Sequence, residues 1–148
     1  MIRYLSRASP RQKRVLVRVD LNVPIKGGRV KDDFRIRAVL PTIRKLLAYG
    51  NRVVLLSHHT DRRQTLAPTT RVLGRLLGEE VGFIRQPEQA DRVRARRVLV
   101  MENLRFWRGE EAARPRFGEV LARWGDVFVN DAFSVSHRRG ASITVLPR

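Results

Sequence analysis

The stretch NRVVLLSHHTDRRQ (51–64) carries the pattern that decides the fold. Its first part is a continuous apolar run, which is typical of a strand covered on both faces, as in a parallel sheet between helices. The run ends abruptly in a polar segment that begins with His58 and His59. In open parallel sheets, ligands bind beyond the carboxyl ends of the strands. The sequence therefore predicts a buried strand that delivers polar side chains to a binding edge.

The rest of the chain alternates between segments with strand character and segments with helical spacing. Apolar runs predict further strands over 14–20, 80–84, 96–103 and 126–133. Apolar residues at helical spacing predict helices over 32–50, 67–78 and 115–125, and a weaker polar pattern predicts one over 87–95. We therefore expect residues 1–148 to form a single α/β, Rossmann-like three-layer domain, with a mostly parallel sheet of about five to six strands and helices on both faces.

The charge of the chain points to an anionic partner without naming it. Lysine and arginine number 31 against 14 aspartates and glutamates, which gives a formal net charge of +17. Such a surplus attracts phosphates, nucleic acids and acidic surfaces, and it is equally compatible with a solvated surface that binds nothing. Aromatic side chains are not interleaved with basic ones as a single-strand binder requires, so nucleic acid is kept as the alternative partner.

Two absences in the sequence narrow the class of protein further. The chain has no cysteine, which excludes disulfides and thiolate metal sites and agrees with a reducing compartment. No apolar run is long enough to span a membrane. We therefore expect a cytoplasmic protein with no membrane partner.

Polar side chains follow four of the predicted strands at their carboxyl ends. A single Asn, Asp or Ser at such a point often only shapes a turn, but four matching ends favour a shared site. Arginines near these ends, including Arg35 and Arg108, offer the forked donors that suit phosphate or carboxylate. The residues at the four ends are Asp20 and Asn22; Ser57, His58 and His59; Glu102, Asn103 and Arg105; and Asn130, Asp131, Ser134, Ser136, His137, Arg138 and Arg139.

The types of residue at this edge limit the chemistry that it can perform. No side chain there is an obvious nucleophile, and the glycine-rich motifs that cradle nucleotide phosphates are absent. The pair His58–His59 lacks the spacing to a third ligand that zinc needs, so no metal site is expected. Glu110 and Glu111 are expected to form a solvated helix start. A donor-rich edge of this kind suits the binding and charge stabilisation of a small phosphorylated acid.

Six segments, in order along nearly the whole chain, resemble one family. The first and the fourth are highly specific. The segments are VRVDLNVP (17–24), DDFRIRAVLPTI (32–43), LLSH (55–58), MENLRF (101–106), VNDAF (129–133) and SHRRGAS (136–142). Together they resemble the N-terminal domain of phosphoglycerate kinase.

The resemblance implies a two-domain, hinge-closing enzyme that moves a phosphoryl group between 1,3-bisphosphoglycerate and ADP, giving 3-phosphoglycerate and MgATP. The N-terminal domain would hold the phosphoglycerate and bind no cofactor itself, while Mg-ATP or ADP would belong to the complete enzyme. Arg35 would lie nearest the transferring phosphoryl group and act as the catalytic residue, stabilising its charge. The substrate-binding residues carried over by the resemblance are Asp20, Asn22, Arg35, His58, Arg105 and Arg138.

The departures from the family pattern matter as much as the matches. The family usually has an arginine where this chain has Asp61, and Arg62 or Arg63 is the candidate substitute. A second histidine of the family pattern is replaced by Gly140. The sequence stops at ITVLPR (143–148), about where the family continues into its nucleotide-binding domain, so we expect that domain to be absent and the chain alone to be inactive.

Three interpretations remain open at this point. The chain is half of an enzyme that works with a separate nucleotide-binding chain, or a basic module repurposed for RNA, a ribosome or another acidic partner, or a structural fragment without activity. The first is favoured by the motifs, and the second is motivated by the net charge of +17 together with Asp61 and Gly140.

Overall fold

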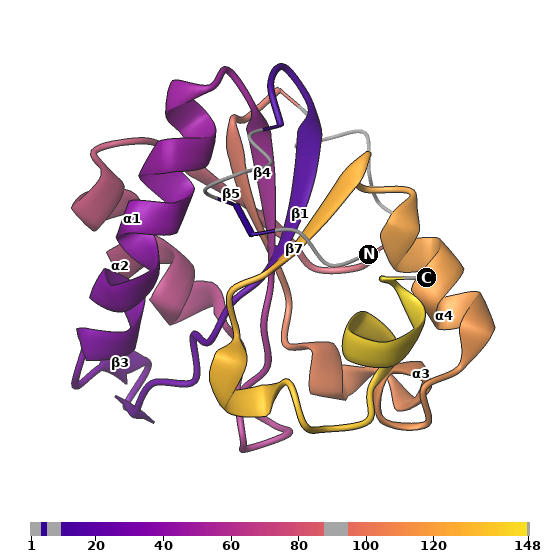
Figure 1. The fold of residues 1–148 in the computed structure, drawn as a ribbon. Helices are drawn as coiled ribbons and strands as arrows, with labels where there is room; N and C mark the ends of the chain where they lie inside the picture. The colour runs from indigo at the N-terminus through magenta and orange to yellow at the C-terminus, as the bar shows by residue number, and fades with distance from the viewer. Residues whose placement is uncertain (1–3, 6–9, 88–94, 148) are drawn as a thin grey trace.

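The computed structural model describes residues 4–5, 10–87 and 95–147, and its centre is a five-stranded parallel sheet in the order β5-β6-β4-β1-β7. The strands of this sheet are β1 (Arg14–Arg18), β4 (Arg52–Leu56), β5 (Val81–Ile84), β6 (Val98–Met101) and β7 (Val127–Asn130). The strand predicted from the apolar run 51–57 is β4, and it lies in the middle. All neighbouring pairs are parallel, so the carboxyl ends of all five strands meet at one edge, at the bottom of Figure 1.

Helices cover both faces of the sheet, which confirms the expected three-layer α/β architecture (Figure 1). Helices α1 (Phe34–Ala48) and α2 (Ala67–Leu77) pack on one face, to the left in Figure 1. Helix α4 (Pro115–Ala122) packs on the other face beside the one-turn helix α3 (Arg108–Glu111) and a π-helical turn, η3 (Ala141–Val145). In the part of the chain that the structure describes, no helix is long and apolar enough to cross a lipid bilayer.

The continuous apolar runs become strands because each strand feeds two hydrophobic clusters. In β4, Val53 and Leu55 join the cluster under α1 and α2, whereas Val54 and Leu56 join the cluster that contains Trp124. Successive side chains of a strand point to opposite faces, so a strand buried on both sides needs apolar residues at every position. The absence of polar alternation in this segment therefore follows from its central place in the sheet.

Helix α1 places its first turn at the carboxyl edge of the sheet. Its apolar residues recur at helical spacing and face the core, among them Ile36, Ile43 and Leu46, which are fully buried. The backbone N–H of Phe34 donates to the carboxylate of Asp32 at 2.8 Å, which satisfies one of the free donors at the helix start. The loop after β1 runs to this helix start, which brings Arg35 beside the residues that follow β1.

The structure corrects the predicted element boundaries and adds elements that the sequence patterns did not predict. Strands β1, β4 and β6 end before their predicted polar residues, which lie in loops at the carboxyl edge, whereas β7 includes Asn130 as its last residue. A two-stranded hairpin, β2 (Ile25–Lys26) and β3 (Arg29–Val30), was missed although Gly27 and Gly28 between them have the positive φ of a tight hairpin turn. The helix predicted over 87–95 lies almost entirely outside the described residues.

Candidate functional site

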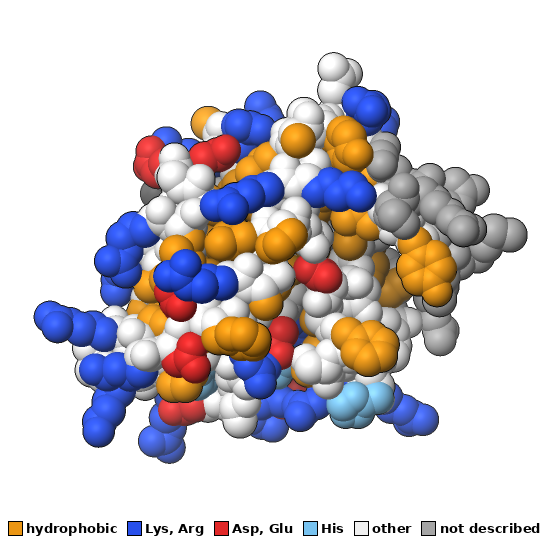
Figure 2. Space-filling view, turned by 60° about the vertical axis from the view of Figure 1, so that its left-hand side comes forward, with side chains coloured by type: hydrophobic (Ala, Val, Ile, Leu, Met, Phe, Trp, Pro, Cys, Tyr) orange, Lys and Arg blue, Asp and Glu red, His pale blue; other side chains and the backbone are white. Residues whose placement is uncertain are grey.

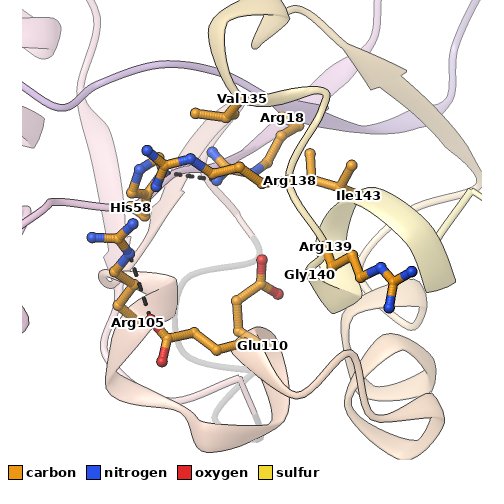
Figure 3. Close-up of a pocket in the computed structure, with 10 residues that line it drawn as sticks. Arg18, His58, Arg105, Glu110, Val135, Arg138, Arg139, Gly140 and Ile143 are labelled. Carbon is orange, nitrogen blue, oxygen red and sulfur yellow. Dashed lines mark hydrogen bonds and ion pairs between the residues drawn. The ribbon is translucent and has the colours of Figure 1, made fainter.

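Loops from four strands enclose a pocket of about 310 Å³ at the carboxyl edge of the sheet (Figure 3). The last residue of β1 and the segments that follow β4, β6 and β7 line it, and these are the four strands whose ends the sequence marked. Four of its lining side chains carry guanidinium groups and two carry carboxyl groups, so the lining is cationic on balance. The lining residues are Arg18, His58, Arg105, Glu110, Glu111, Val135, Arg138, Arg139, Gly140 and Ile143.

The side chain at the base of this pocket is Arg18, the last residue of β1, which is 3% exposed. Its guanidinium has five N–H donors. Its Nη1 donates hydrogen bonds to the carbonyl oxygens of Val19 and Leu56, at 2.9 and 3.3 Å. Its Nε–H donates to the hydroxyl of Ser142 at 3.1 Å. Burial lowers the pKa of Arg18 to about 10, so the group stays charged while its neighbours in contact are neutral.

A fourth N–H of Arg18, on Nη2, donates a hydrogen bond to Nδ1 of His58 at 2.8 Å. Because a guanidinium only donates, Nδ1 must be the acceptor and the ring proton of neutral His58 lies on Nε2. Burial, followed by the nearby charges of Arg18 and Arg105, lowers the pKa of His58 to about 4. At neutral pH the histidine is thus an uncharged donor on the pocket wall.

Arg105, Arg138 and Arg139 complete the cationic lining. The Nη1 group of Arg105 donates to the carbonyl oxygen of Thr60 at 3.1 Å, which holds the side chain across the mouth of the pocket. Burial and the charge of Arg138 lower the pKa of Arg105. Among the residues that the structure describes, the side chains of Arg138 and Arg139 make no hydrogen bond or ion pair.

Glu110 corrects the expectation of a solvated helix start, because its side chain is 6% exposed and faces the pocket. Its carboxylate accepts from both the backbone N–H and the hydroxyl of Ser142. Burial raises the pKa of Glu110. The neighbouring Glu111 keeps the expected exposure and pairs with Arg62 at 2.7 Å.

A second group of predicted residues lies beside the pocket without lining it. The Asp20 carboxylate pairs with Arg35 and accepts a hydrogen bond from the hydroxyl of Ser134 at 2.8 Å. Asn22 exchanges two hydrogen bonds with Thr60: its amide donates to the Thr60 hydroxyl at 2.8 Å and accepts from the Thr60 N–H at 3.0 Å. The charges of Glu110 and, to a lesser extent, Asp20 raise the pKa of Arg18 against the larger effect of burial, so the second group is electrostatically connected to the pocket.

The loop after β4 determines where Asp61 and its two neighbouring arginines point. The Asp61 carboxylate accepts from the backbone N–H of Arg63 at 2.8 Å and so stabilises a turn of its own loop. Arg62 extends to Glu111, a lining residue of the pocket. Arg63 has no hydrogen bond from its guanidinium among the described residues. Of the two predicted substitutes, Arg62 is therefore the one at the pocket mouth.

The two histidines of the opening stretch have separate roles. His59 donates from Nε2 to the carbonyl oxygen of Val23 at 3.0 Å and accepts at Nδ1 from the N–H of Asp61 at 3.0 Å. Both of its ring nitrogens are thus used within the loops. In the described part of the chain, no three His, Cys, Asp or Glu side chains are grouped as metal ligands.

Most of this edge was predicted from the sequence, but two residues of the pocket were missed. His58, Arg105 and Arg138 line one pocket, whereas Asp20, Asn22 and Arg35 form the neighbouring group. Arg18 and Glu110 were missed. Arg18 had a signal, because a charged residue interrupts the apolar strand RVLVRV at a position that must face a covered side of the sheet. Glu110 had none, since its burial depends on packing against residues 32 positions away.

The fold and the pocket define an α/β domain with a cationic cavity at the carboxyl edge of a parallel sheet, a usual position for ligands in such folds. The sequence model of the family described as Phosphoglycerate kinase matches residues 5–148. The chain therefore belongs to the phosphoglycerate kinase family, as the motif resemblance implied.

Individual relatives agree with this assignment. The chain is 46% identical to phosphoglycerate kinase of Xanthobacter autotrophicus, an alignment that covers 99% of the chain and 40% of the relative. It is 36% identical to cytosolic phosphoglycerate kinase of Leishmania major, over 95% of the chain and 40% of the relative. The chain thus spans about two fifths of the length of the curated relatives that it matches.

Solved structures give the same result at the level of the backbone. Phosphoglycerate kinase from Coxiella burnetii matches with a TM-score of 0.80 and 33% identity, over 93% of this chain and 37% of that structure. The enzyme from Pyrococcus horikoshii matches with a TM-score of 0.79 and 33% identity, over 93% and 38%.

Proposed function

We propose that the chain is the phosphoglycerate-binding part of a phosphoglycerate kinase and that it binds 3-phosphoglycerate or 1,3-bisphosphoglycerate in the pocket at the carboxyl edge. The observation that carries the proposal is that four arginines and the neutral donor His58 line one cavity of about 310 Å³. The substrate has a phosphate at one end and a carboxyl group at the other. Guanidinium forks match both groups in shape and charge.

The buried positive charge of Arg18 is the feature of the pocket that most favours binding of an anion. A buried charge whose direct contacts are neutral loses hydration without an opposite charge in contact, and the Glu110 and Asp20 carboxylates offset this loss only from beyond the immediate neighbours of Arg18. A bound phosphate or carboxylate would supply that charge in a site of low polarity, where the attraction is stronger than in water. Arg105, Arg138 and Arg139 would add positive charge around the mouth of the pocket. Arg62 would replace the arginine that the family usually has at the position of Asp61.

The group formed by Asp20, Asn22 and Arg35 would hold the rest of the substrate. In this proposal Asp20 and Asn22 contact the hydroxyl and carboxylate end of the substrate. Arg35 gives up its ion pair with Asp20 in part and lies next to the transferring phosphoryl group, where it offsets the charge that spreads over the phosphoryl oxygens. No nucleophile is needed, because direct transfer requires mainly positioning and charge stabilisation.

The nucleotide would be held by a domain outside these 148 residues, in a partner chain or in the same polypeptide. The cationic pocket lining does not fit Mg²⁺, which prefers carboxylate, carbonyl and water oxygens. We therefore assign Mg-ATP and ADP to the complete enzyme and derive no step through the metal here. A cytoplasmic location is part of the proposal, and the Leishmania relative is named as cytosolic.

The decisive experiment is a titration of the chain with 3-phosphoglycerate at low ionic strength, followed by NMR and by calorimetry. We expect saturable binding that weakens as salt is added, with shifts at the residues of the pocket. Glycerate and inorganic phosphate, each carrying one of the two anionic ends, should bind more weakly. If 3-phosphoglycerate produces no shift at Arg18, Arg105 or Arg138 under these conditions, the proposed function is wrong.

A nucleic acid or another acidic macromolecule is the second candidate, and the net charge of +17 favours it. On the face covered by α1 and α2, Lys and Arg side chains are spread out with Asp and Glu side chains between several of them (Figure 2). This distribution resembles a solvated surface more than a defined binding track. Labelled RNA distinguishes the candidates: a steep loss of affinity with salt, unaffected by 3-phosphoglycerate, would support the second one.

A further inference from the structure

A chain of four buried polar side chains links the wall of the pocket to its base. It runs from Glu110 in α3 to Ser142 in η3, then to Arg18 at the end of β1 and to His58 after β4 (Figure 3 shows all but Ser142). All four side chains are at most 6% exposed. The links are side-chain hydrogen bonds between segments that are up to 124 positions apart in sequence.

The chemistry of the groups fixes the direction of each hydrogen bond. Ionised Glu110 only accepts, so the Ser142 hydroxyl donates to one carboxylate oxygen while the Ser142 backbone N–H donates to the other at 3.0 Å. The hydroxyl oxygen then turns a lone pair toward Arg18 Nε–H, 3.1 Å away. The guanidinium in turn donates to His58 Nδ1 and leaves the ring proton on Nε2.

These bonds leave Arg18 with a single uncommitted N–H. Of its five donors, Nε–H, both Nη1 hydrogens and one Nη2 hydrogen have acceptors among the described residues. The remaining Nη2 hydrogen is the only one available to a ligand. Since the guanidinium is planar and rigid, holding its other four donors also fixes where this last one points.

We propose that Glu110 is a positioning residue of the anion pocket: acting through Ser142, it fixes Arg18 and thereby sets both the free N–H of Arg18 and the Nε2–H of His58 toward the ligand. The inference rests on the proposed function for the nature of that ligand. It assigns to a buried carboxylate a role in binding an anion, although the carboxylate itself repels one.

Gly140 provides a second, independent reason for this assignment. A Cβ atom built at position 140 would lie 2.9 Å from Glu110 Oε1, closer than side-chain carbons approach other atoms. The Glu110 carboxylate thus occupies the space into which a side chain at 140 would extend. The departure from the family pattern at Gly140 is compatible with this packing, because a larger side chain at 140 would require the Glu110 carboxylate to move.

Charge and positioning predict opposite results when Glu110 is replaced by glutamine. If Glu110 acts only through its charge, E110Q removes a negative group from the pocket and 3-phosphoglycerate binds more tightly. If Glu110 positions Arg18, the amide can no longer accept at both atoms, the Ser142 hydroxyl loses its fixed direction and binding weakens. The matched control is E111Q, which removes a charge from the same pocket at a residue that pairs with Arg62 and Arg105 and does not contact Ser142.

The experiment combines 3-phosphoglycerate titrations with ¹⁵N NMR of the His58 ring, on variants whose folding is checked by thermal unfolding. For E110Q we expect the dissociation constant to rise about ten-fold and the Nε2–H form of His58 to lose its dominance even without ligand. For S142A, which removes the middle of the chain and leaves Glu110 in place, we expect the same two changes. E111Q should bind as tightly as the wild type or more tightly, with His58 unchanged.

The two readouts separate the inference from the proposed function. Binding by E110Q that equals or exceeds that of the wild type, with the His58 tautomer unchanged, would overturn the positioning role. S142A tests the same role by the same two readouts should the glutamine variant fold poorly. If the wild type binds no 3-phosphoglycerate, the proposed function fails, whereas the His58 signals of the two variants still report whether Glu110 orients Arg18.

Discussion

The two ends of the parallel sheet are both rich in arginine, but they use it differently. At the amino edge, Arg14, Arg52, Arg96 and Arg123 surround a smaller hollow of about 160 Å³. There Arg14 pairs with Asp126 at 2.7 Å and Arg96 pairs with Glu80, and both arginine side chains are nearly half exposed. At the carboxyl edge Arg18 is buried against neutral groups.

The contrast shows that the net charge of the chain does not locate a binding site. An arginine that is hydrated and paired with a carboxylate gains little from a further anion. A buried arginine in contact with neutral groups gains much more, because the anion replaces the lost water and places an opposite charge in direct contact. The carboxyl edge is therefore the candidate site, and the amino edge serves as its internal control.

Replacing Arg18 by methionine tests the comparison most severely. Methionine fills a similar volume without charge, so we expect the fold to persist. We expect affinity for 3-phosphoglycerate to fall on the order of several hundred-fold, about 3–4 kcal/mol. Calorimetric titration at low ionic strength measures the loss.

The matched control at the opposite edge is R14M. It removes the same charge from the same strand, and we expect its affinity to stay within about two-fold of the wild type, because exposed charges at this distance are screened. Equal losses in R18M and R14M would mean that general charge, and not the pocket, binds the ligand.

The pH dependence of stability tests the burial of the carboxyl edge without any ligand. The pKa of His58 is about 4 in the folded chain against its ordinary 6.5. Between these values the unfolded chain binds a proton that the folded chain does not, so the free energy of unfolding falls as pH falls from 6.5 to 4. The expected contribution is about 2–3 kcal/mol, fully lost at the acid end of the window.

The variant H58N isolates this contribution. Asparagine can accept from Arg18 with its amide oxygen but does not titrate. Denaturant unfolding at several pH values should show a flatter profile for H58N than for the wild type between pH 6.5 and 4. Identical profiles would indicate that His58 is hydrated and protonates freely in the folded chain.

The fold could be predicted from sequence to the extent that it depends on local patterns. The buried strand in 51–57 and the amphipathic spacing around Ile36 and Ile43 are properties of neighbouring residues, and both were confirmed. The polar strand ends were placed within strands because nothing local marks where a ladder stops. The hairpin at Gly27 and Gly28 had a local signal that was overlooked.

The same distinction between local patterns and long-range contacts applies to the candidate site. The strand ends identified its edge, since parallel topology brings all carboxyl ends together. The burial of Glu110 could not be predicted, because it depends on Ser142, 32 positions away, and the same holds for the close approach of its carboxylate to Gly140. Arg18 lies between these cases: its strand was predicted, but its role depends on Ser142, which is 124 positions away.

The mouth of the carboxyl edge gives a smaller test, through Arg62 and Arg63. Arg62 pairs with Glu111 beside the pocket, so R62A removes a cation from the mouth and frees Glu111 for Arg105. We expect about five-fold weaker binding of 3-phosphoglycerate, near 1 kcal/mol. R63A should change affinity by less than about two-fold, and titrations of the two variants side by side decide which arginine replaces the missing one. A larger effect from R63A would reverse the assignment.

The smallest effect is expected at the amino edge, from D126N. The variant removes the carboxylate partner of Arg14 but keeps an oxygen that can accept from the Arg14 backbone N–H. Because the pair is exposed, we expect unfolding to become easier by only about 0.5 kcal/mol, a difference that disappears in high salt. Chemical denaturation with and without 1 M salt measures it.

D126N also tests which property, burial or pairing with a carboxylate, makes the two edges differ in anion binding. It leaves Arg14 without its carboxylate but still hydrated, so we expect no saturable phosphate binding near Arg14 in an NMR titration. If phosphate does bind there as tightly as at the carboxyl edge, then neutralisation by acids is what keeps the amino edge from being a site. If it does not, burial is the decisive property, since neither Arg18 nor Arg14 would then contact a carboxylate directly and only the buried one would bind.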